Sequence, residues 1–199
     1  VKVVKKEKDS DRVLEGAVFA LCAKEDITGT DGKVILKADT VIEELATDKE
    51  GKLTFKADLP IGFAYYIKET SPAPGFATTD ETQEFTFAYE GAEKEKVSYA
   101  FTFEDEPTVI EITKTSLTDG KELEGAKLQV TDESGKVVDS WTSGKEAHII
   151  KELVVGQKYT LTETKPADGY VTAESITFTV EDTAKSQKIE MKDDVTKVE

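Results

Sequence analysis

The chain repeats itself: IKETSPAPGF at residues 67–76 returns as LTETKPADGY at residues 161–170, and LEGAVFAL at residues 14–21 returns as LEGAKLQV at residues 123–130. These segments combine β-branched and aromatic residues with Gly and Pro at places suited to turns. Self-similarity of this kind indicates that one structural unit occurs twice. A chain of 199 residues is long enough for two units of about 100 residues, each with a core of its own.

The repeats have the composition of strands and turns. Runs rich in Val, Ile, Thr, Phe and Tyr alternate with Gly- and Asp-rich turns, and no segment shows a sustained apolar period of 3.6 residues. We therefore expect an all-β protein, and we interpret the charged run YEGAEKEK at residues 89–96 as a loop. The expected strands lie near residues 1–6, 17–23, 52–56, 64–69, 84–89, 96–104, 109–114, 126–131, 136–142, 147–151, 158–164, 175–180 and 186–192.

The first repeat is longer than the second. Lys5 and Glu69 lie 64 residues apart, whereas the corresponding Lys114 and Glu163 lie 49 residues apart. We place the roughly fifteen extra residues at about residues 24–45, as a longer hairpin, a short helix, or both.

The two repeats meet near Pro107. The last strand of the first repeat ends there and the first strand of the second comes directly after it, so we expect one domain over residues 1–107 and another over residues 108–199. A linker this short predicts a fairly stiff connection between the two domains.

Charged residues interrupt the apolar face of a strand at six places. Side chains two apart on a strand share a face, so a charge in phase with apolar neighbours points into the core. In the first repeat these charges are Lys5 after Val1 and Val3, Glu69 after Tyr65 and Ile67, and Asp105 after Phe101 and Phe103. In the second they are Lys114 after Ile110 and Ile112, Glu163 after Tyr159 and Leu161, and Asp193 after Ile189 and Met191. Buried ions are costly unless they are paired, neutralised or consumed by chemistry, so a doubled triad requires a reason.

An amine and a carboxyl placed side by side in an apolar core can react. Desolvation lowers the pKa of a buried amine and raises that of a buried carboxyl, which favours the neutral form of each. A neutral amine is a nucleophile, and a protonated carboxyl can release water while a second carboxyl moves the proton. Fixed geometry can supply an effective molarity of about 10⁵ M or more. The product is an amide between two side chains, and the alternative interpretation of each triad is an unreacted buried ion cluster.

Three motifs together carry a family resemblance. A Lys nine residues before LxGA, a Glu-Thr followed by Pro and Gly-aromatic (ETSPAPGF, ETKPADGY), and a last strand ending in Asp resemble the collagen-adhesin (Cna) B-type or SpaA-type domains of Gram-positive surface proteins and pilins. The resemblance covers nearly the whole chain, twice. It implies two tandem inverse-immunoglobulin-like, prealbumin-like β-sandwiches, in which a first-strand Lys bonds to a last-strand Asn or Asp.

The resemblance also implies roles for the six charged residues. It implies an isopeptide bond from Lys5 to Asp105 assisted by Glu69, and one from Lys114 to Asp193 assisted by Glu163. Many family members use Asn as the acceptor, whereas both acceptors here are Asp, so water rather than ammonia would leave. Glu104 and Glu106 flank Asp105, and Asp194 follows Asp193, but only the residue in phase with the apolar face can reach the core.

Composition excludes several classes of function. With 41 acidic against 26 basic residues the formal charge is −15, which argues against nucleic acid as a partner. No apolar run approaches the roughly 20 residues of a membrane helix, so we expect no membrane insertion in this segment. With one Cys and one His, His148, the sequence has no zinc or catalytic-triad pattern, and we expect neither metal nor cofactor. We expect His148 to face solvent from a strand and Trp141 to pack at a strand end.

These observations favour a structural role. The leading interpretation, implied by the resemblance, is a stalk module of an extracellular, cell-wall-anchored adhesin or pilin, with neighbouring domains of the same surface protein as its partners. The alternative is an adhesin module that binds a host extracellular-matrix protein or glycan. A turnover enzyme that uses the carboxylates, such as a glycosidase, is disfavoured because the carboxylates lie on core faces. Formation of one bond per domain does not make the protein an enzyme in the ordinary sense.

Overall fold

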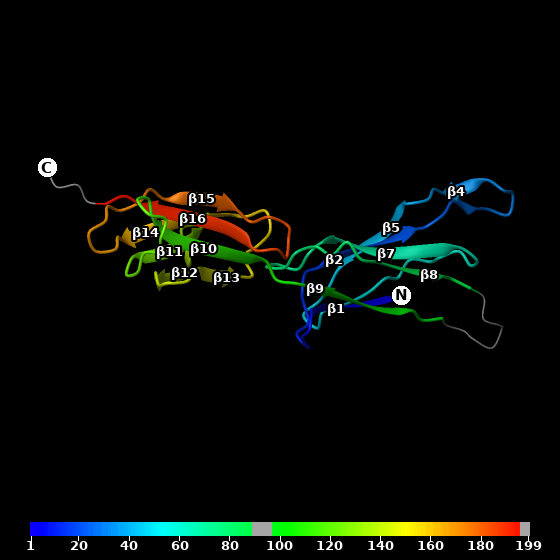
Figure 1. The fold of residues 1–199 in the computed structure, drawn as a ribbon. Coiled ribbons are helices and arrows are strands. Elements are labelled where there is room, and N and C mark those ends of the chain that lie inside the picture. Colours follow the sequence, from blue (N-terminus) through cyan, green and yellow to red (C-terminus); the bar gives the residue numbers. More distant parts are fainter. Residues whose placement is uncertain (89–96, 196–199) are drawn as a thin grey trace. The chain divides into compact units, whose positions relative to one another are not determined.

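The computed structural model describes residues 1–88 and 97–195, and it divides the chain into two compact units, Val1–Glu106 and Pro107–Glu199 (Figure 1). The expected loop at residues 89–96 lies outside the described residues, as do the adjoining ends of two expected strands. The secondary structure of the described part consists of strands, which confirms the all-β prediction. No helix in these two ranges is long and apolar enough to cross a membrane.

The first unit consists of two sheets and a small hairpin. Apolar residues of the two sheets meet in one core, where Phe19 and Phe103 from opposite sheets have ring centroids 4.9 Å apart. The three-stranded sheet has the order β6 (Lys52–Thr54), β1 (Lys2–Glu7), β9 (Ala100–Asp105). The four-stranded sheet has the order β5 (Val41–Ala46), β2 (Val18–Ala23), β7 (Ala64–Ser71), β8 (Thr82–Thr86).

The second unit repeats this arrangement. Its core contains apolar residues of both sheets, among them Ile112, Leu128, Leu161 and Met191. The three-stranded sheet has the order β13 (His148–Lys151), β10 (Val109–Ser116), β16 (Gln187–Asp193). The four-stranded sheet has the order β12 (Val137–Thr142), β11 (Lys127–Asp132), β14 (Lys158–Lys165), β15 (Ile176–Thr179).

In each unit the first and last strands are hydrogen-bonded neighbours. β1 pairs with β9, and β10 pairs with β16, in both cases parallel. Parallel neighbours cannot be joined by a tight turn, so the rest of the unit lies between them in the sequence. The two ends of each unit are therefore brought to one sheet.

The first unit differs from the second in the segment after its second strand. β2 reaches its edge partner β5 through residues 24–40, which include the hairpin β3 (Ile27–Thr28) and β4 (Val34–Leu36). The corresponding strands of the second unit, β11 and β12, are joined by residues 133–136 alone. No helix occurs in this segment, all of which the structure describes.

His148 is less exposed than its strand pattern predicts. Its ring stacks on Trp141 with centroids 4.0 Å apart, and its Nε2 atom lies 2.8 Å from Oδ2 of Asp139. His148 lies on β13 and Trp141 on β12, which belong to different sheets, so the pair packs across the edge of the sandwich. His148 is thus half-buried, with 30% of its side chain exposed, because Trp141 from the other sheet covers part of its ring.

Two buried Lys–Glu–Asp triads

The structure brings the three charged residues of the first repeat together. Lys5 lies on β1, Glu69 on β7 and Asp105 at the end of β9. The Lys5 Nζ atom is 2.5 Å from Oδ1 of Asp105 and 3.0 Å from Oε1 of Glu69. All three side chains are 0% exposed, so the cluster lies inside the sandwich.

The second repeat contains the same cluster. The Lys114 Nζ atom on β10 is in direct contact with Oδ1 of Asp193 on β16, and it lies 3.1 Å from Oε1 of Glu163 on β14. The Lys114 side chain is 2% exposed and the two carboxyl side chains are 0% exposed. Each amine therefore touches the Asp it would attack and stands beside a Glu.

Strand register explains why the geometry repeats. Lys5 pairs with Phe103 across the β1–β9 ladder, and Lys114 pairs with Met191 across the β10–β16 ladder. Asp105 and Asp193 lie two residues further along than Phe103 and Met191, so each faces the same side and lies within reach of the long Lys side chain.

The out-of-phase acidic residues beside each acceptor point away from the core. Glu104, Glu106 and Asp194 are exposed, whereas Asp105 and Asp193 are 2% and 1% exposed. This difference arises from the period-2 alternation of a strand and leaves one acidic residue per last strand in contact with the Lys.

Burial perturbs the carboxyl groups. Desolvation raises the pKa of Glu69 to about 7, although Lys5 and the backbone N–H of Thr79 both act to lower it. Burial also raises the pKa of Asp193, against the opposing effect of its hydrogen bond with Lys114. The clusters therefore retain carboxyl protons at a pH where exposed carboxyls are ionised.

The two clusters differ in the residue opposite the Glu. Phe19 pairs with Glu69 across β2 and β7, and its ring centroid is 5.4 Å from the Lys5 Nζ atom. Leu128 occupies the same place opposite Glu163 in the second unit. An aromatic face stabilises an ammonium ion. Phe19 therefore stabilises the charged form of Lys5, whereas Leu128 cannot do the same for Lys114.

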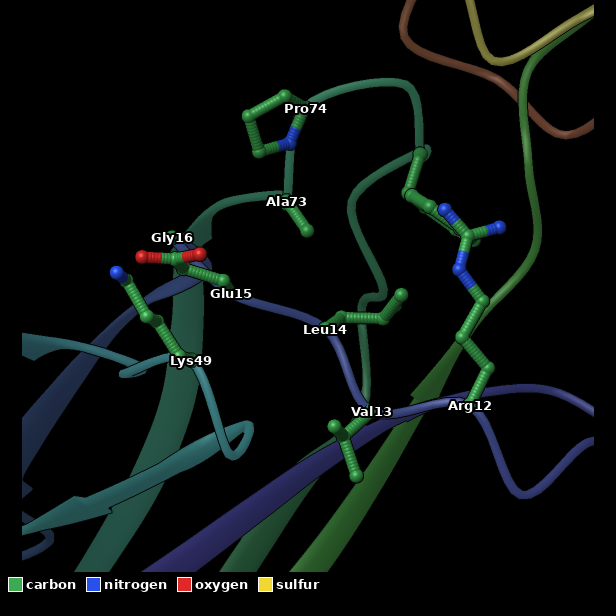
Figure 2. Close-up of a pocket in the computed structure, with 9 residues that line it drawn as sticks. Arg12, Val13, Leu14, Glu15, Gly16, Lys49, Ala73 and Pro74 are labelled. Atoms are coloured by element: carbon green, nitrogen blue, oxygen red, sulfur yellow. The ribbon is translucent and has the colours of Figure 1, made fainter.

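The triad side chains of both units are nearly inaccessible to solvent, with exposed fractions of 0–2%. The first unit has a depression of about 410 Å³ lined by Arg12, Glu15, Lys49, Pro74 and neighbouring residues (Figure 2), and none of its lining residues belongs to the triad. Figure 2 shows Glu15 and Lys49 on one side of the depression and Arg12 on the other. Within residues 1–88 and 97–195, no group of three or more His, Cys, Asp and Glu side chains is placed to hold a metal ion.

Sequence reasoning missed the backbone groups that hold each Glu. Oε2 of Glu69 accepts a hydrogen bond from the N–H of Thr79 at 2.9 Å, and Oε2 of Glu163 accepts one from the N–H of Ala173 at 2.8 Å. The donor lies ten residues after the Glu in both units. The one available signal in the sequence was that the segment from the Glu to the donor has the same length in both repeats. Any residue except proline has a backbone N–H, so residue type does not reveal such a donor.

Comparison with known proteins gives a family match to both units. The SpaA prealbumin-like fold domain matches residues 1–100 and residues 108–195. No curated protein matches the chain significantly.

Solved structures give likenesses at low identity. The Bacillus anthracis TIE protein is 24% identical over 98% of this chain and 33% of its own, with a TM-score of 0.54. The shaft pilin SpaA from Lactobacillus rhamnosus GG is 18% identical over 99% of this chain and 98% of its own (TM-score 0.42), and a streptococcal ancillary pilin is 23% identical over 96% and 61% (TM-score 0.39). The chain spans about a third of the TIE structure, and that likeness concerns the fold alone.

The two family matches together cover most of the sequence, and the chain belongs to the SpaA prealbumin-like fold domain family.

Proposed function

We propose that the chain is a stalk module of a Gram-positive surface adhesin or pilin, in which each domain is closed by an isopeptide bond that forms without another enzyme. The observation that carries this proposal is the contact between a buried Lys amine and a buried Asp carboxyl, which occurs in both units with the same strand register. A SpaA-type domain is a structural domain of surface proteins, which agrees with this role.

The proposed reaction is a condensation. The Nζ lone pair of Lys5 or Lys114 attacks the carboxyl carbon of Asp105 or Asp193, and a C–N bond forms. The neighbouring Glu takes a proton from the nitrogen and gives it to the departing hydroxyl, so the C–O bond breaks and one water leaves. No electrons are exchanged with an outside group, and each domain reacts once rather than turning over.

Charge balance favours this reaction inside the core. The reactive cluster is neutral overall. A neutral amine and two carboxylates carry a charge of −2, and the two protons on the Asp and Glu carboxyls cancel it. Such a cluster meets a smaller desolvation penalty than one with a net charge, and the amide product removes two ionisable groups from the core. The raised pKa values of Glu69 and Asp193 support retention of the protons that the reaction needs.

The placement of the bond suits a load-bearing role. We propose domains over residues 1–107 and 108–199, in which Lys5 and Asp105 are 100 residues apart and Lys114 and Asp193 are 79 apart. A bond between first and last strands carries the tension past nearly all of the domain, because the linked strands are those through which force enters and leaves. A catalytic or ligand-binding role provides no reason for this placement.

The same proposal sets the location and the partners. We place the chain outside the cell as part of a wall-anchored protein, with neighbouring domains of that protein as its immediate partners. The formal charge of −15 argues against nucleic acid.

The mass of the purified chain tests the chemistry. We expect a mass below that of the sequence by about 36 Da, which is one water for each bond. The variant Glu163→Gln keeps the volume of the side chain but removes the proton carrier, so its deficit should fall to about 18 Da. The exposed residue Glu133 supplies the control, and Glu133→Gln should keep the full deficit.

Two results would contradict the proposal. An unmodified chain with the full sequence mass would mean that the clusters are unreacted ions. A cross-linked Lys114–Asp193 peptide recovered from Glu163→Gln would remove Glu163 from the mechanism.

A further inference from the structure

The loop after each Glu makes the same contacts in both units. We call residues 72–79 and residues 166–173 the clamp loops. The N–H of Thr79, at the end of the first clamp loop, donates to Oε2 of Glu69 at 2.9 Å. The N–H of Ala173, at the end of the second, donates to Oε2 of Glu163 at 2.8 Å. In both units the other oxygen, Oε1, is left facing the Lys amine.

Each clamp loop also holds the strand that carries the acceptor. The N–H of Ala77 donates to the carbonyl of Glu106 at 3.0 Å, and the N–H of Val171 donates to the carbonyl of Asp194 at 3.0 Å. Glu106 and Asp194 directly follow the acceptors Asp105 and Asp193. One loop therefore fastens the Glu side chain and the end of the Asp strand, although these lie in different sheets.

A tight turn gives the clamp loops their shape. The N–H of Phe76 donates to the carbonyl of Ala73 at 3.0 Å, and the N–H of Tyr170 donates to that of Ala167 at 3.1 Å. The Gly inside each turn has φ near +90°, at 89° for Gly75 and 87° for Gly169, which is the left-handed region that glycine adopts without strain. The repeated Glu-Thr, Pro and Gly-aromatic pattern is thus the sequence of a turn that carries one backbone donor to the Glu carboxyl and another to the end of the Asp strand.

We propose that the clamp loops are positioning elements of the isopeptide reaction, in which the N–H of Thr79 and of Ala173 orients the Glu carboxyl so that Oε1 faces the amine. This inference rests on the proposed function. Thr79 and Ala173 are positioning residues, since they act on the reaction through the Glu.

The physical need for such a device is clear. A Glu carboxyl, at the end of a side chain with three rotatable bonds, must keep one oxygen beside the nitrogen while a proton moves through it. A misplacement of about 1 Å can slow an enzymatic step by about 100-fold. A backbone N–H is a fixed donor that holds one oxygen and leaves the other free to act. It also favours the ionised carboxyl, and this contact counts among the influences that lower the pKa of Glu69.

Replacement of a single backbone N–H by an ester oxygen tests the proposal. The whole chain is assembled by chemical ligation in guanidinium chloride with the ester at Thr79, so that the reaction begins only on dilution. Intact mass and peptide mapping then track the loss of water in each domain over a range of pH. The control carries the ester at Asp80, whose N–H has no hydrogen-bond acceptor among the residues that the structure describes.

We expect the Thr79 ester to slow water loss in the first domain by about tenfold or more. The reactive cluster must keep its protons, so the rate falls as pH rises through the Glu69 pKa of about 7. Removal of a donor to the ionised carboxyl raises that pKa, and the alkaline fall in rate should therefore move to higher pH. The second domain and the Asp80 control should react as in the unmodified chain.

An unchanged rate and an unchanged pH midpoint in the first domain would overturn the proposal. A first domain that stays sensitive to protease after dilution would also overturn it, because the hydrogen bond would then serve folding rather than the reaction. Failure of the proposed function has a different signature, which is that the unmodified chain loses no water in either domain.

Discussion

Lys114→Met is the substitution that measures what the cross-link contributes to stability. Met has nearly the length of Lys and no charge, so it fills the same space in the core while it removes the nucleophile. The residues left behind, Asp193 and Glu163, stay in a buried site where desolvation raises the pKa of Asp193.

The magnitude depends on the length of the closed loop. Lys114 and Asp193 are 79 residues apart, and the chain-entropy estimate for a cross-link of that span is about 4.5 kcal/mol. The free energy of unfolding of the second domain should fall by about this amount. The variant also releases the unfolded chain from its cross-link, so more surface is exposed on unfolding and the m-value should rise.

Guanidinium unfolding monitored by the fluorescence of Trp141 is the assay. Trp141 is the only Trp of the chain and packs against the core of the second unit, so its signal reports on that unit. The control Lys127→Met changes an exposed Lys of the same unit and should shift the free energy by less than about 0.5 kcal/mol.

The m-value separates the two interpretations of the triad. Removal of one partner from an unreacted buried ion pair also costs about 3–5 kcal/mol, so a loss of stability alone would not distinguish them. A loss of stability with an unchanged m-value would refute the cross-link, because an ion cluster leaves the unfolded chain as free as before.

Three further results are expected. In a Lys5→Met background no bond forms in the first domain, and the charge that lowers the pKa of Glu69 is gone, so this pKa lies above its value of about 7 in the unmodified chain. The folded state then binds more protons than the unfolded state from pH 4.5 to beyond pH 7. Stability is therefore fully present below pH 4.5 and falls as pH rises through this range, and adding Glu69→Gln should remove most of this slope in pH-dependent denaturation. The variant Phe19→Leu gives the first unit the residue that the second unit has opposite its Glu, and it removes an aromatic face that favours the ammonium form of Lys5. Water loss from the first domain, followed by timed intact mass, should therefore be severalfold faster. An unchanged or slower rate would exclude this effect. When the chain is pulled by its ends, the bonded protein should lengthen little, whereas the double variant Lys5→Met with Lys114→Met should extend by most of its contour; full extension of the unmodified chain would speak against a load-bearing stalk.

Much of the fold can be predicted from local pattern. Alternation with a period of two residues predicts strands and their inner faces, because successive side chains on a strand point to opposite sides. The same alternation identified Lys5 as a core-facing charge. It also distinguished Asp105 from its exposed acidic neighbours Glu104 and Glu106. The internal repeat then supported the assignment, since the pattern recurs at Lys114 and Asp193.

Other features were not accessible from pattern, because they depend on which distant segments pair. The parallel register that sets Phe103 opposite Lys5 joins residues about 100 positions apart, and no local preference specifies such an offset. The cover of His148 by Trp141 depends on how two edge strands of different sheets meet.

The sequence by itself determined the strands, their buried faces, the doubled triads and the kind of chemistry that a buried amine and carboxyl can undergo. Only the tertiary structure decided that each Lys amine touches a buried Asp, that Phe19 lies over one amine, and that the N–H groups of Thr79 and Ala173 donate to the Glu carboxyls. The physical reason is that the type and spacing of side chains record which face is buried. A backbone N–H is present at every position except proline, so its role becomes visible only when the folded chain brings it to an acceptor.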